Sequence, residues 1–339
     1  MEGLLTKAPL KIGIIGAGAI SVFHMKGWAA QSDVELISIC DTNRDLAAAR
    51  ASEFGIEKVY SDAAEMFAQE AFDAVDIITP VKTHADLTRL AADHSVHVMC
   101  QKPMTPTVAE ASKLIEDVGT RVRFMIHENY RWRPHYRRIA ALLAAGAIGR
   151  PLHARMTVRS ASMVASPGET PFLLARQPYL ANFKRLLIFE VLIHHMDTLR
   201  SLLGELEVTY ATTAKVNSAL AGEDVAVISM TGADGITVLL DGNISAMGYG
   251  PLPGDFLEIV GTEDTLIFAR DRIFLMSAPD EAEIQDMEAN YQACFTGAIT
   301  DFVQGLRTGA AFATDRLDNL QTLTLMENAY RAAGVPLDF

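Results

Sequence analysis

Cysteine is scarce in this chain: Cys40, Cys100 and Cys294 are the only three among 339 residues. An odd number of cysteines, set mostly in apolar surroundings, argues against a disulfide framework and predicts reduced core thiols. No hydrophobic run approaches the roughly 20 residues that a membrane-spanning helix needs. The first residues carry one lysine ahead of a predicted strand and lack the apolar stretch and cleavage site of a secretory signal. These absences lead us to expect a cytoplasmic protein without a membrane partner.

Positive charge is also in deficit. The sequence has 29 lysine and arginine residues against 42 aspartate and glutamate residues, which gives a net charge of −13. Because it shows no basic stripe, we expect no nucleic-acid partner. Hydrophobic residues make up 50% and charged residues 21% of the chain, as in ordinary globular proteins. The length suggests about two domains, each able to bury its own core.

A glycine-rich turn follows the first predicted strand, residues 10–15. It reads Gly16-Ala17-Gly18-Ala19-Ile20-Ser21 and opens a predicted helix that runs to about residue 30. Gly16 permits the tight turn, and Gly18 lets a pyrophosphate approach the backbone and the N-terminus of the helix. Ser21 stands in the third glycine position, where a small residue still allows close packing of helix and strand. We therefore predict a dinucleotide site formed by Gly16, Gly18, Ala19 and Ile20.

An acidic residue closes the second predicted strand, residues 34–40. Asp41 lies about 20 residues beyond the glycines, where the dinucleotide fingerprint places an acid. A carboxylate there accepts hydrogen bonds from a ribose 2′-hydroxyl and repels a 2′-phosphate, so it favours NAD over NADP. Arg44 could stack on the adenine or pair with a phosphate. A helix N-cap before residues 42–50 is an alternative role for Asp41, compatible with the first.

A lysine stands directly after another predicted strand, residues 98–101. Lys102 is followed at once by Pro103, which restricts the backbone conformation of Lys102 at the end of the strand. Ligands of open parallel sheets bind in the crevice beyond the carboxyl ends of the strands. Lys102 is therefore predicted to face the ligand, with an ordinary solvated surface lysine as the alternative.

The pattern of predicted elements changes near His127. Strands alternate with helices before it, which predicts an α/β domain with a doubly wound parallel sheet over residues 1–127. Short alternating strands and turn dipeptides follow it, which predicts an α+β domain over residues 128–339 with an open, mostly antiparallel sheet. The last helix could pack back on the first domain. The face of the open sheet would favour a homodimer or homotetramer.

One predicted helix of the second domain, residues 186–197, carries polar residues in apolar surroundings. Glu190 and His194 are four apart and His194 and Asp197 three apart, so all three project from one α-helical face. A carboxylate beside an imidazole can fix one tautomer and move a pKa toward neutrality, which suits proton transfer. Two buried polar groups that merely satisfy each other, or a metal site, are the alternatives; the sequence offers no further ligand cluster, and we expect no metal. His195 points about 100° away and is predicted to be structural.

Together these motifs resemble the Gfo/Idh/MocA oxidoreductases, over nearly the whole chain. The resemblance rests on the glycine loop with Asp41, Thr79-Pro80 with His84, Lys102-Pro103, Asn129-Tyr130-Arg131, and the spaced Glu190, His194 and Asp197. It implies that the first domain is an NAD-binding Rossmann domain. It also implies that Lys102 and His194 are catalytic and that Glu190 replaces the family's aspartate. Cofactor contacts are then expected from Thr79, Pro80, His84, Gln101 and Lys102.

Three positions depart from the family pattern: Gln101 replaces a glutamate, Leu192 a glycine, and Ser21 a glycine or small apolar residue. The stretches Gln101-Lys102-Pro103, 127–132 and 177–180 are similar to a branch that includes apiose dehydrogenases. By position, the predicted substrate contacts are Asn129, Arg131, Arg176, Gln177, Tyr179 and Asp197.

The expected reaction is hydride transfer between a sugar or polyol hydroxyl carbon and the nicotinamide of NAD. His194 would act as the base, held by Glu190, and Lys102 would stabilise the charge on the reacting oxygen, although the two roles could be exchanged. No obvious basic cluster awaits a phosphate, so unphosphorylated substrates are expected. Some relatives cleave glycosides by transient oxidation with bound NAD, and others only sense the dinucleotide; both remain alternatives.

Overall fold

The computed structural model describes residues 8–166 and 168–337. The chain forms two compact units, one that runs to Asn129 and includes Gln292–Leu320, and one that comprises Tyr130–Tyr291 and the residues from Gln321 onward. The helices α9 (Met287–Thr308) and α10 (Arg316–Ala332) contribute residues to both. The domain limits 1–127 and 128–339 stay a prediction. A stretch from the C-terminal part of the chain, Gln292–Leu320, belongs to the first unit.

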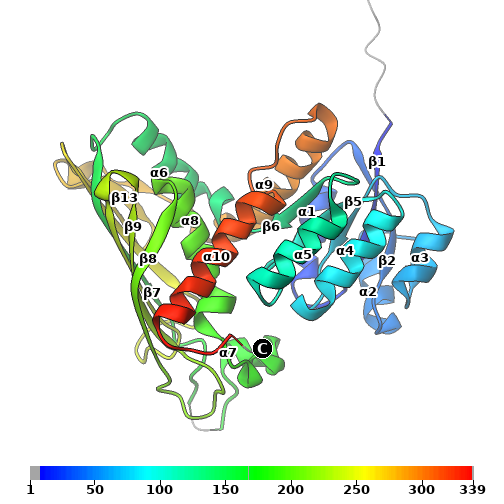
Figure 1. Ribbon diagram of the computed structural model, residues 1–339, viewed down its shortest axis with the longest axis horizontal. Coiled ribbons are helices and arrows are strands. Elements are labelled where there is room, and N and C mark those ends of the chain that lie inside the picture. Colours follow the sequence, from blue (N-terminus) through cyan, green and yellow to red (C-terminus); the bar gives the residue numbers. More distant parts are fainter. Residues whose placement is uncertain (1–7, 167, 338–339) are drawn as a thin grey trace, which may run out of the picture. The chain divides into compact units, whose positions relative to one another are not determined.

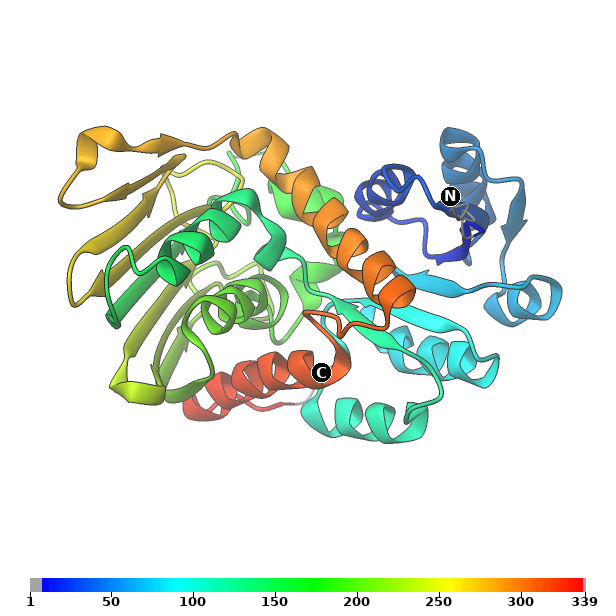
Figure 2. The same cartoon turned by 90° about the horizontal axis from the view of Figure 1, so that it is seen from above.

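The first unit contains a six-stranded sheet in the order β3-β2-β1-β4-β5-β6, and every neighbouring pair is parallel. Its strands are β1 (Leu10–Ile15), β2 (Val34–Cys40), β3 (Lys58–Tyr60), β4 (Ala74–Ile77), β5 (His97–Gln101) and β6 (Phe124–His127). Its helices are α1 (Ser21–Ala29), α2 (Arg44–Phe54), α3 (Ala63–Gln69), η1 (Val81–Thr83), α4 (His84–Asp93) and α5 (Val108–Val118). Figure 2 shows α1 and α2 on one face of this sheet and α4 and α5 on the other. The predicted doubly wound sheet is confirmed.

The strands of this sheet are buried on both faces because helices cover both. All four residues of β4 and all four of β6 are buried, so these strands do not show the alternating burial of a strand that is exposed on one face. The strand order reverses between β1 and β4. In doubly wound sheets the ligand crevice lies at such a reversal, beyond the carboxyl ends of the strands.

The second unit contains an eight-stranded sheet in the order β14-β13-β12-β11-β7-β10-β9-β8, antiparallel except for the pair β7 and β10. Its strands are β7 (Pro151–Arg159), β8 (Leu206–Ala214), β9 (Val225–Gly232), β10 (Thr237–Asn243), β11 (Gly254–Gly261), β12 (Thr265–Ala269), β13 (Arg272–Leu275) and β14 (Glu283–Ile284). Its helices are η2 (Tyr130–Trp132), α6 (Pro134–Ala144), α7 (Phe172–Arg176), η3 (Pro178–Asn182), η4 (Leu187–Leu192), α8 (Ile193–Leu203), η5 (Ala233–Gly235) and η6 (Pro279–Glu281).

One face of the second sheet forms the core of its unit. Burial alternates along β9, where Ala226, Ile228 and Met230 are fully enclosed and the residues between them are half-buried. This period of two is the pattern of a sheet covered on one side only. Figure 1 shows α6 and α8 along the covered face. The predicted open and mostly antiparallel sheet is confirmed.

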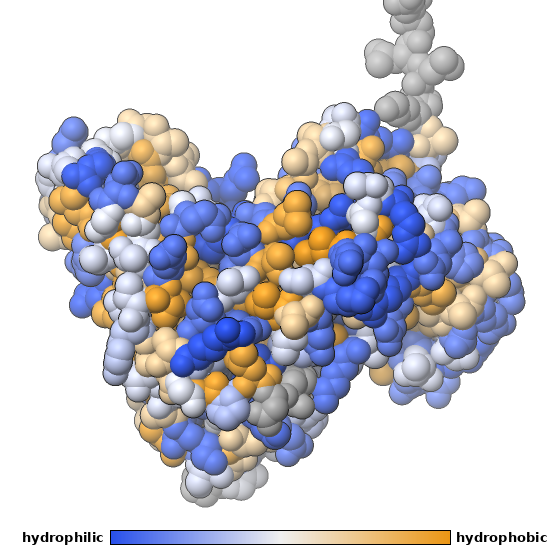
Figure 3. Space-filling view, in the orientation of Figure 1, coloured by the Kyte–Doolittle hydropathy of each residue, from blue (hydrophilic) through white to orange (hydrophobic). Residues whose placement is uncertain are grey.

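Exposed hydrophobic side chains are scattered over the surface. They include Leu46 in the first unit and Tyr210, Met247 and Ile284 in the second. Figure 3 shows hydrophobic and hydrophilic residues interspersed over the face drawn, as on ordinary protein surfaces. Among the residues that the structure describes, no helix is both long and apolar enough to cross a membrane.

Candidate active site

The glycine loop between β1 and α1 takes a conformation that requires glycine. Gly16 has a φ of +110°, and a Cβ there would lie 2.4 Å from the backbone oxygen of Ile78, at the end of β4. A Cβ at Gly18, by contrast, would meet nothing within 4 Å. The loop is therefore pressed against the sheet at its first glycine and open at its second.

Asp41 ties this loop to the end of β2. Its Oδ2 accepts a hydrogen bond of 2.7 Å from the amide of Ala17, and its Oδ1 one of 2.8 Å from the amide of Asn43. Asn43, not Asp41, caps α2, with its side chain accepting from the amides of Asp45 and Leu46. The alternative role of Asp41 as helix N-cap is therefore wrong. Each carboxylate oxygen keeps a further lone pair that could accept a ribose hydroxyl.

The start of α1 suits an anion. No described side chain caps this end, and its first turn holds no acidic residue. The amides of the turn and the helix dipole there attract negative charge, and the open space beside Gly18 leaves room for a pyrophosphate. The residues present thus fit a dinucleotide, with Ala19 and Ile20 in the turn and the exposed Arg44 at the start of α2.

His84 links the ends of β4 and β5. One ring nitrogen lies 2.8 Å from the backbone oxygen of Thr79, the other 2.8 Å from that of Pro103, and the side chain is fully enclosed. Burial lowers the pKa of His84, against the two carbonyl contacts that raise it. Because both nitrogens are used within the protein, this geometry favours positioning of the Thr79-Pro80 and Lys102-Pro103 loops. Direct contact of His84 with the cofactor stays a prediction.

Lys102 stands where its strand ends. β5 finishes at Gln101 between β4 and β6, and the peptide bond from Lys102 to Pro103 is cis. The side chain of Lys102 is half-buried, so the residue is not a freely solvated surface lysine. Its amide donates a 2.7 Å hydrogen bond to Oε1 of Gln101. Lys102 is therefore held at the carboxyl end of the parallel strands, where ligands of this fold bind.

The sequence predicted one continuous α-helix that carries Glu190 and His194, and this prediction is wrong. The helix begins as a π-helix, Leu187–Leu192, and becomes the α-helix α8 only at Ile193. Glu190, Val191 and His194 are half-buried, whereas the other residues from Leu186 to Arg200 are enclosed, Asp197 among them. Glu190 and His194 are thus both accessible on this helix, and Asp197 is not. π-helical turns occur frequently at functional sites.

Two buried residues from elsewhere in the chain cap the π-helix. Glu223 accepts hydrogen bonds of 3.1 Å and 3.0 Å from the amides of Leu186 and Ile188. The hydroxyl of Tyr330 donates to Glu223 at 2.6 Å and accepts from the amide of Phe189 at 3.0 Å. Burial raises the pKa of Glu223, opposed by these donors. No local signal in the sequence points to either residue, so the sequence analysis missed both.

An aromatic ring holds His194. Tyr130 stacks on its imidazole with ring centres 4.2 Å apart and an interplanar angle of 7°. The guanidinium of Arg133 lies 3.7 Å from the centre of the Tyr130 ring. Thr198 donates a 2.8 Å hydrogen bond to the backbone oxygen of His194. Tyr130 belongs to the predicted motif but was assigned no role, and the stacking identifies it as a support for the imidazole.

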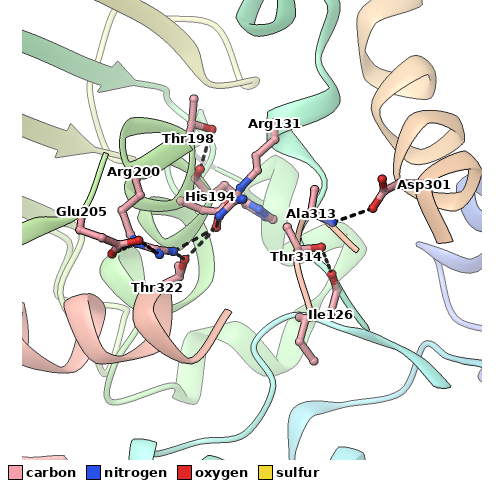
Figure 4. A network of polar contacts seen from close by, with 11 residues as sticks. Ile126, Arg131, His194, Thr198, Arg200, Glu205, Asp301, Ala313, Thr314 and Thr322 are labelled. Carbon is pink, nitrogen blue, oxygen red and sulfur yellow. Dashed lines mark hydrogen bonds and ion pairs between the residues drawn. The ribbon is translucent and has the colours of Figure 1, made fainter. Parts of the chain in front are cut away.

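Arg131 forms an ion pair with the enclosed carboxylate of Asp197. Figure 4 shows Arg131 with its neighbours Arg200, Glu205 and Thr322. Nε and Nη2 of Arg131 donate to the two oxygens of Asp197 at 2.6 Å and 2.7 Å, and the hydroxyl of Thr322 donates to the same carboxylate at 2.7 Å. Arg200 donates to Thr322 and to the carboxylate of Glu205. Asp197 therefore has its oxygens engaged, which favours a role in orienting Arg131. Its direct contact with a substrate stays a prediction.

The remaining predicted substrate residues fall into two places. Asn129 is buried in the first unit, where its amide donates to the sulfur of Cys294 at 3.2 Å. Arg176 ends α7, Gln177 joins α7 to η3, and Tyr179 lies on η3, all in the second unit and none of them enclosed. Burial, and the negative charge of Glu190, raise the pKa of Tyr179 to about 12. Tyr179 thus lies within electrostatic reach of Glu190, whereas Asn129 faces the core of its own unit.

His195 is enclosed and structural in its contacts, with Nε2 3.1 Å from Asp255 and Nδ1 3.2 Å from the backbone oxygen of Val191. Within the described ranges, no group of three or more histidine, cysteine and acidic residues is arranged to hold a metal ion. Lys102 belongs to the first unit and His194 to the second, so their predicted pairing stays a prediction.

Comparisons with known proteins agree with this geometry. Residues 10–125 match the oxidoreductase family with an NAD-binding Rossmann fold, and residues 136–267 match the GFO/IDH/MocA C-terminal domain. The D-apiose dehydrogenases of Rhizobium rhizogenes and Paraburkholderia graminis are 32% and 34% identical over 338 residues. These alignments cover 96% and 95% of this chain and 95% and 87% of the relatives.

A crystal structure of an oxidoreductase from Agrobacterium radiobacter, in complex with NAD+, L-tartaric acid and magnesium, is 31% identical and superposes with a TM-score of 0.88. The match covers 96% of this chain and 97% of that one. The family resemblance, the oxidoreductase class and the NAD cofactor, all predicted from sequence motifs, are confirmed. The chain therefore belongs to the GFO/IDH/MocA family of oxidoreductases, and its first unit contains an NAD-binding Rossmann domain.

Proposed function

We propose that this protein is an NAD-dependent dehydrogenase that oxidises a hydroxyl-bearing carbon of an unphosphorylated sugar or polyol. The observation that carries the proposal is His194, a half-buried imidazole stacked on Tyr130 and on the same side of its helix as Glu190. An imidazole held in this way can take the proton of a substrate hydroxyl. The similarity to two D-apiose dehydrogenases supports a sugar as substrate.

Each residue has a defined task in this reaction. NAD, when bound, supplies the nicotinamide that accepts the hydride. His194 accepts the hydroxyl proton, and Glu190 orients the imidazole and stabilises its protonated form. The ammonium of Lys102 stabilises the negative charge that develops on the reacting oxygen. If Lys102 and His194 exchange these roles, the same groups still move one proton and balance one charge.

The substrate contacts are proposed on the accessible segment that carries Arg176, Gln177 and Tyr179, together with Arg131. The Asp197 carboxylate neutralises Arg131 and fixes its guanidinium, so this arginine would attract a phosphate less strongly than an arginine without an acidic partner. A free aldose or polyol suits such a lining better than a sugar phosphate.

A substrate screen tests the function. Free aldoses, including apiose, polyols and their phosphates are incubated with NAD or NADP, and the absorbance of the reduced cofactor is followed. We expect turnover with an unphosphorylated compound and NAD, and its loss in Lys102→Met. Cleavage of a glycoside without net NADH, or tight NAD binding without turnover of any compound, would overturn the assignment.

We also propose that the half-buried face of the second sheet joins two or four copies of the chain. Leu239 and Val227 lie on that face, between enclosed neighbours. Light scattering measures the mass of the assembly. Leu239→Lys should lower the mass from that of a dimer or tetramer, and a parent protein with the mass of a monomer contradicts the proposal.

Three buried free thiols, Cys40, Cys100 and Cys294, fit a reducing compartment, and we propose the cytoplasm.

A further inference from the structure

A chain of polar side chains lies beneath Lys102 in the first unit. Oδ2 of Asp76, on β4, is 2.8 Å from Nδ1 of His24, on α1. Nε2 of His24 is 3.0 Å from Nε2 of Gln101, the last residue of β5. Oε1 of Gln101 accepts a 2.7 Å hydrogen bond from the amide of Lys102. The contacts run without interruption from a buried carboxylate to the backbone of the proposed catalytic lysine.

The hydrogen positions in this chain follow from donor and acceptor chemistry. The amide of Lys102 can only donate, so the oxygen of the Gln101 side chain must face it, and the NH2 group must face His24. That NH2 group can only donate, so Nε2 of His24 must accept and carries no proton. The carboxylate of Asp76 can only accept, so Nδ1 of His24 carries the ring proton. One tautomer of His24 satisfies every contact.

Packing prevents the ring of His24 from leaving this arrangement. His24 and Asp76 are completely enclosed. Trp28 donates a second hydrogen bond, 2.7 Å long, to the same oxygen of Asp76. The ring of His127 lies 4.0 Å from that of His24, centre to centre, and the ring of Phe295 lies 5.3 Å away. A buried carboxylate with two donors and an imidazole between aromatic rings form a rigid support.

We propose that Asp76, His24 and Gln101 form a positioning relay that holds Lys102 in place and that requires glutamine, rather than glutamate, at position 101. This rests on the proposed function, because it assumes that Lys102 acts in the reaction. The relay residues do not touch the reacting atoms. They fix the tautomer of His24, the tautomer fixes the amide of Gln101, and that amide fixes the backbone at Lys102.

The requirement for glutamine follows from the unprotonated Nε2 of His24. A glutamate at position 101 could still accept from the amide of Lys102, but its second oxygen would face Nε2 of His24, an acceptor against an acceptor. The contact is restored only if one more proton binds, either to residue 101 or to Nε2 of His24, and the carboxylate of Asp76 on the other side of the ring favours Nε2. The resulting imidazolium would lie between the carboxylates of Asp76 and residue 101, with His127 and Lys102 as the other titratable neighbours.

The tautomer can be measured without any substrate. In the 15N-labelled protein, a long-range 15N–1H correlation spectrum of the nine histidines distinguishes protonated from unprotonated ring nitrogens. His24 is assigned by the loss of its signals in His24→Asn. We expect a protonated Nδ1 and an unprotonated Nε2 in the parent, and two protonated nitrogens in Gln101→Glu. A proton on Nε2 of the parent protein overturns the relay.

Kinetics test whether the relay positions Lys102. Gln101→Met keeps the length of the side chain and removes its polar atoms, so kcat should fall about tenfold or more, by a larger factor than the affinity for NAD. Gln101→Glu should also lower kcat. The matched control is Gln69→Met, an exposed glutamine on α3. If both Gln101 variants keep the parent kcat, Lys102 is not held by this chain.

A double-mutant cycle separates positioning from simple stabilisation. Asp76→Asn should lower kcat in the parent but have little further effect in the Gln101→Met background, because the relay is already broken. Equal losses in both backgrounds would show that Asp76 acts on kcat independently of Gln101 and would overturn the proposal. If Asp76→Asn does not fold, the Gln101 variants still decide. If the parent oxidises no sugar, the proposed function fails, while the tautomer of His24 stands or falls on its own spectrum.

Discussion

In the proposed reaction, the imidazole of His194 accepts the proton of the substrate hydroxyl. His194, the proposed base, is half-buried, and the ring of Tyr130 stacks on its imidazole with ring centres 4.2 Å apart. General acid–base catalysis contributes about 10²–10⁴-fold in rate, so His194→Ala should lower kcat by about that factor and leave the Kd for NAD unchanged. Steady-state kinetics and NAD titration measure both. The control is His153→Ala, which removes a histidine from β7 outside the proposed site and should keep the parent kcat. A parent-like kcat in His194→Ala would show that His194 is not the base.

Another histidine should make folding sensitive to pH. His135 is enclosed, stacks on Phe268 with ring centres 4.5 Å apart, and makes no ring-nitrogen hydrogen bond to a described residue. Burial, helped by the nearby charge of Arg133, lowers its pKa from 6.5 to about 3. The folded protein therefore keeps this ring neutral while the unfolded chain takes up a proton below about pH 6.5. Its contribution to stability is complete above that pH and is lost as the pH falls toward 3.

One substitution isolates the loss of stability that His135 causes at low pH. Between pH 7 and pH 5 the parent should lose about 2 kcal/mol of unfolding free energy through this ring. His135→Phe keeps a ring against Phe268 and cannot titrate, so its stability should fall by that much less over the same interval. Urea denaturation at the two pH values gives both numbers. Identical pH dependence in the two proteins would mean that folding does not lower the pKa of His135.

At the level of secondary structure, the π-helix Leu187–Leu192 depends on two residues distant in sequence. Tyr330→Phe removes the hydroxyl that joins Glu223 to the amide of Phe189 and leaves both buried groups with one partner fewer. Such losses cost about 1–3 kcal/mol, which urea denaturation would detect. Since the π-helix leads directly into α8, kcat should fall as well. Tyr249→Phe, at an exposed tyrosine, is the control, and equal stability of the two variants would contradict the capping role.

These elements also show where prediction from sequence stops. The parallel sheet follows from apolar runs separated by helices, and the second sheet from its alternating strands. The π-helix could not be recognised, because over six residues a period of about 4.4 does not differ visibly from 3.6. Glu223 and Tyr330 carry no local signal, since what matters is their contact with amides far along the chain. The sequence marks Gln101 as a departure from a motif and as an expected cofactor contact. Its partner His24 lies 77 residues away in the chain and carries no local signal of this contact.

For the whole molecule, the dinucleotide site makes stability depend on the cofactor. A ligand that binds only the folded chain stabilises it by about 2.7 kcal/mol when present at 100 times its Kd. We therefore expect NAD to raise the unfolding temperature of the full chain in a concentration-dependent way, measured by differential scanning calorimetry. NADP at the same concentration should raise it less, because Asp41 lies at the end of β2, where a ribose 2′-phosphate would meet its negative charge.

Two glycine variants make this test specific. Gly16→Ala forces a side chain onto a φ of +110° and into the backbone oxygen of Ile78, so the glycine loop must distort and NAD should no longer stabilise the protein. Gly55→Ala is the matched control: its φ of +69° is also strained for alanine, but a Cβ there meets nothing within 4 Å and the residue caps the far end of α2. Both variants should unfold at lower temperature without ligand, and only Gly55→Ala should respond to NAD. A full NAD response in Gly16→Ala would show that the cofactor does not bind at this loop.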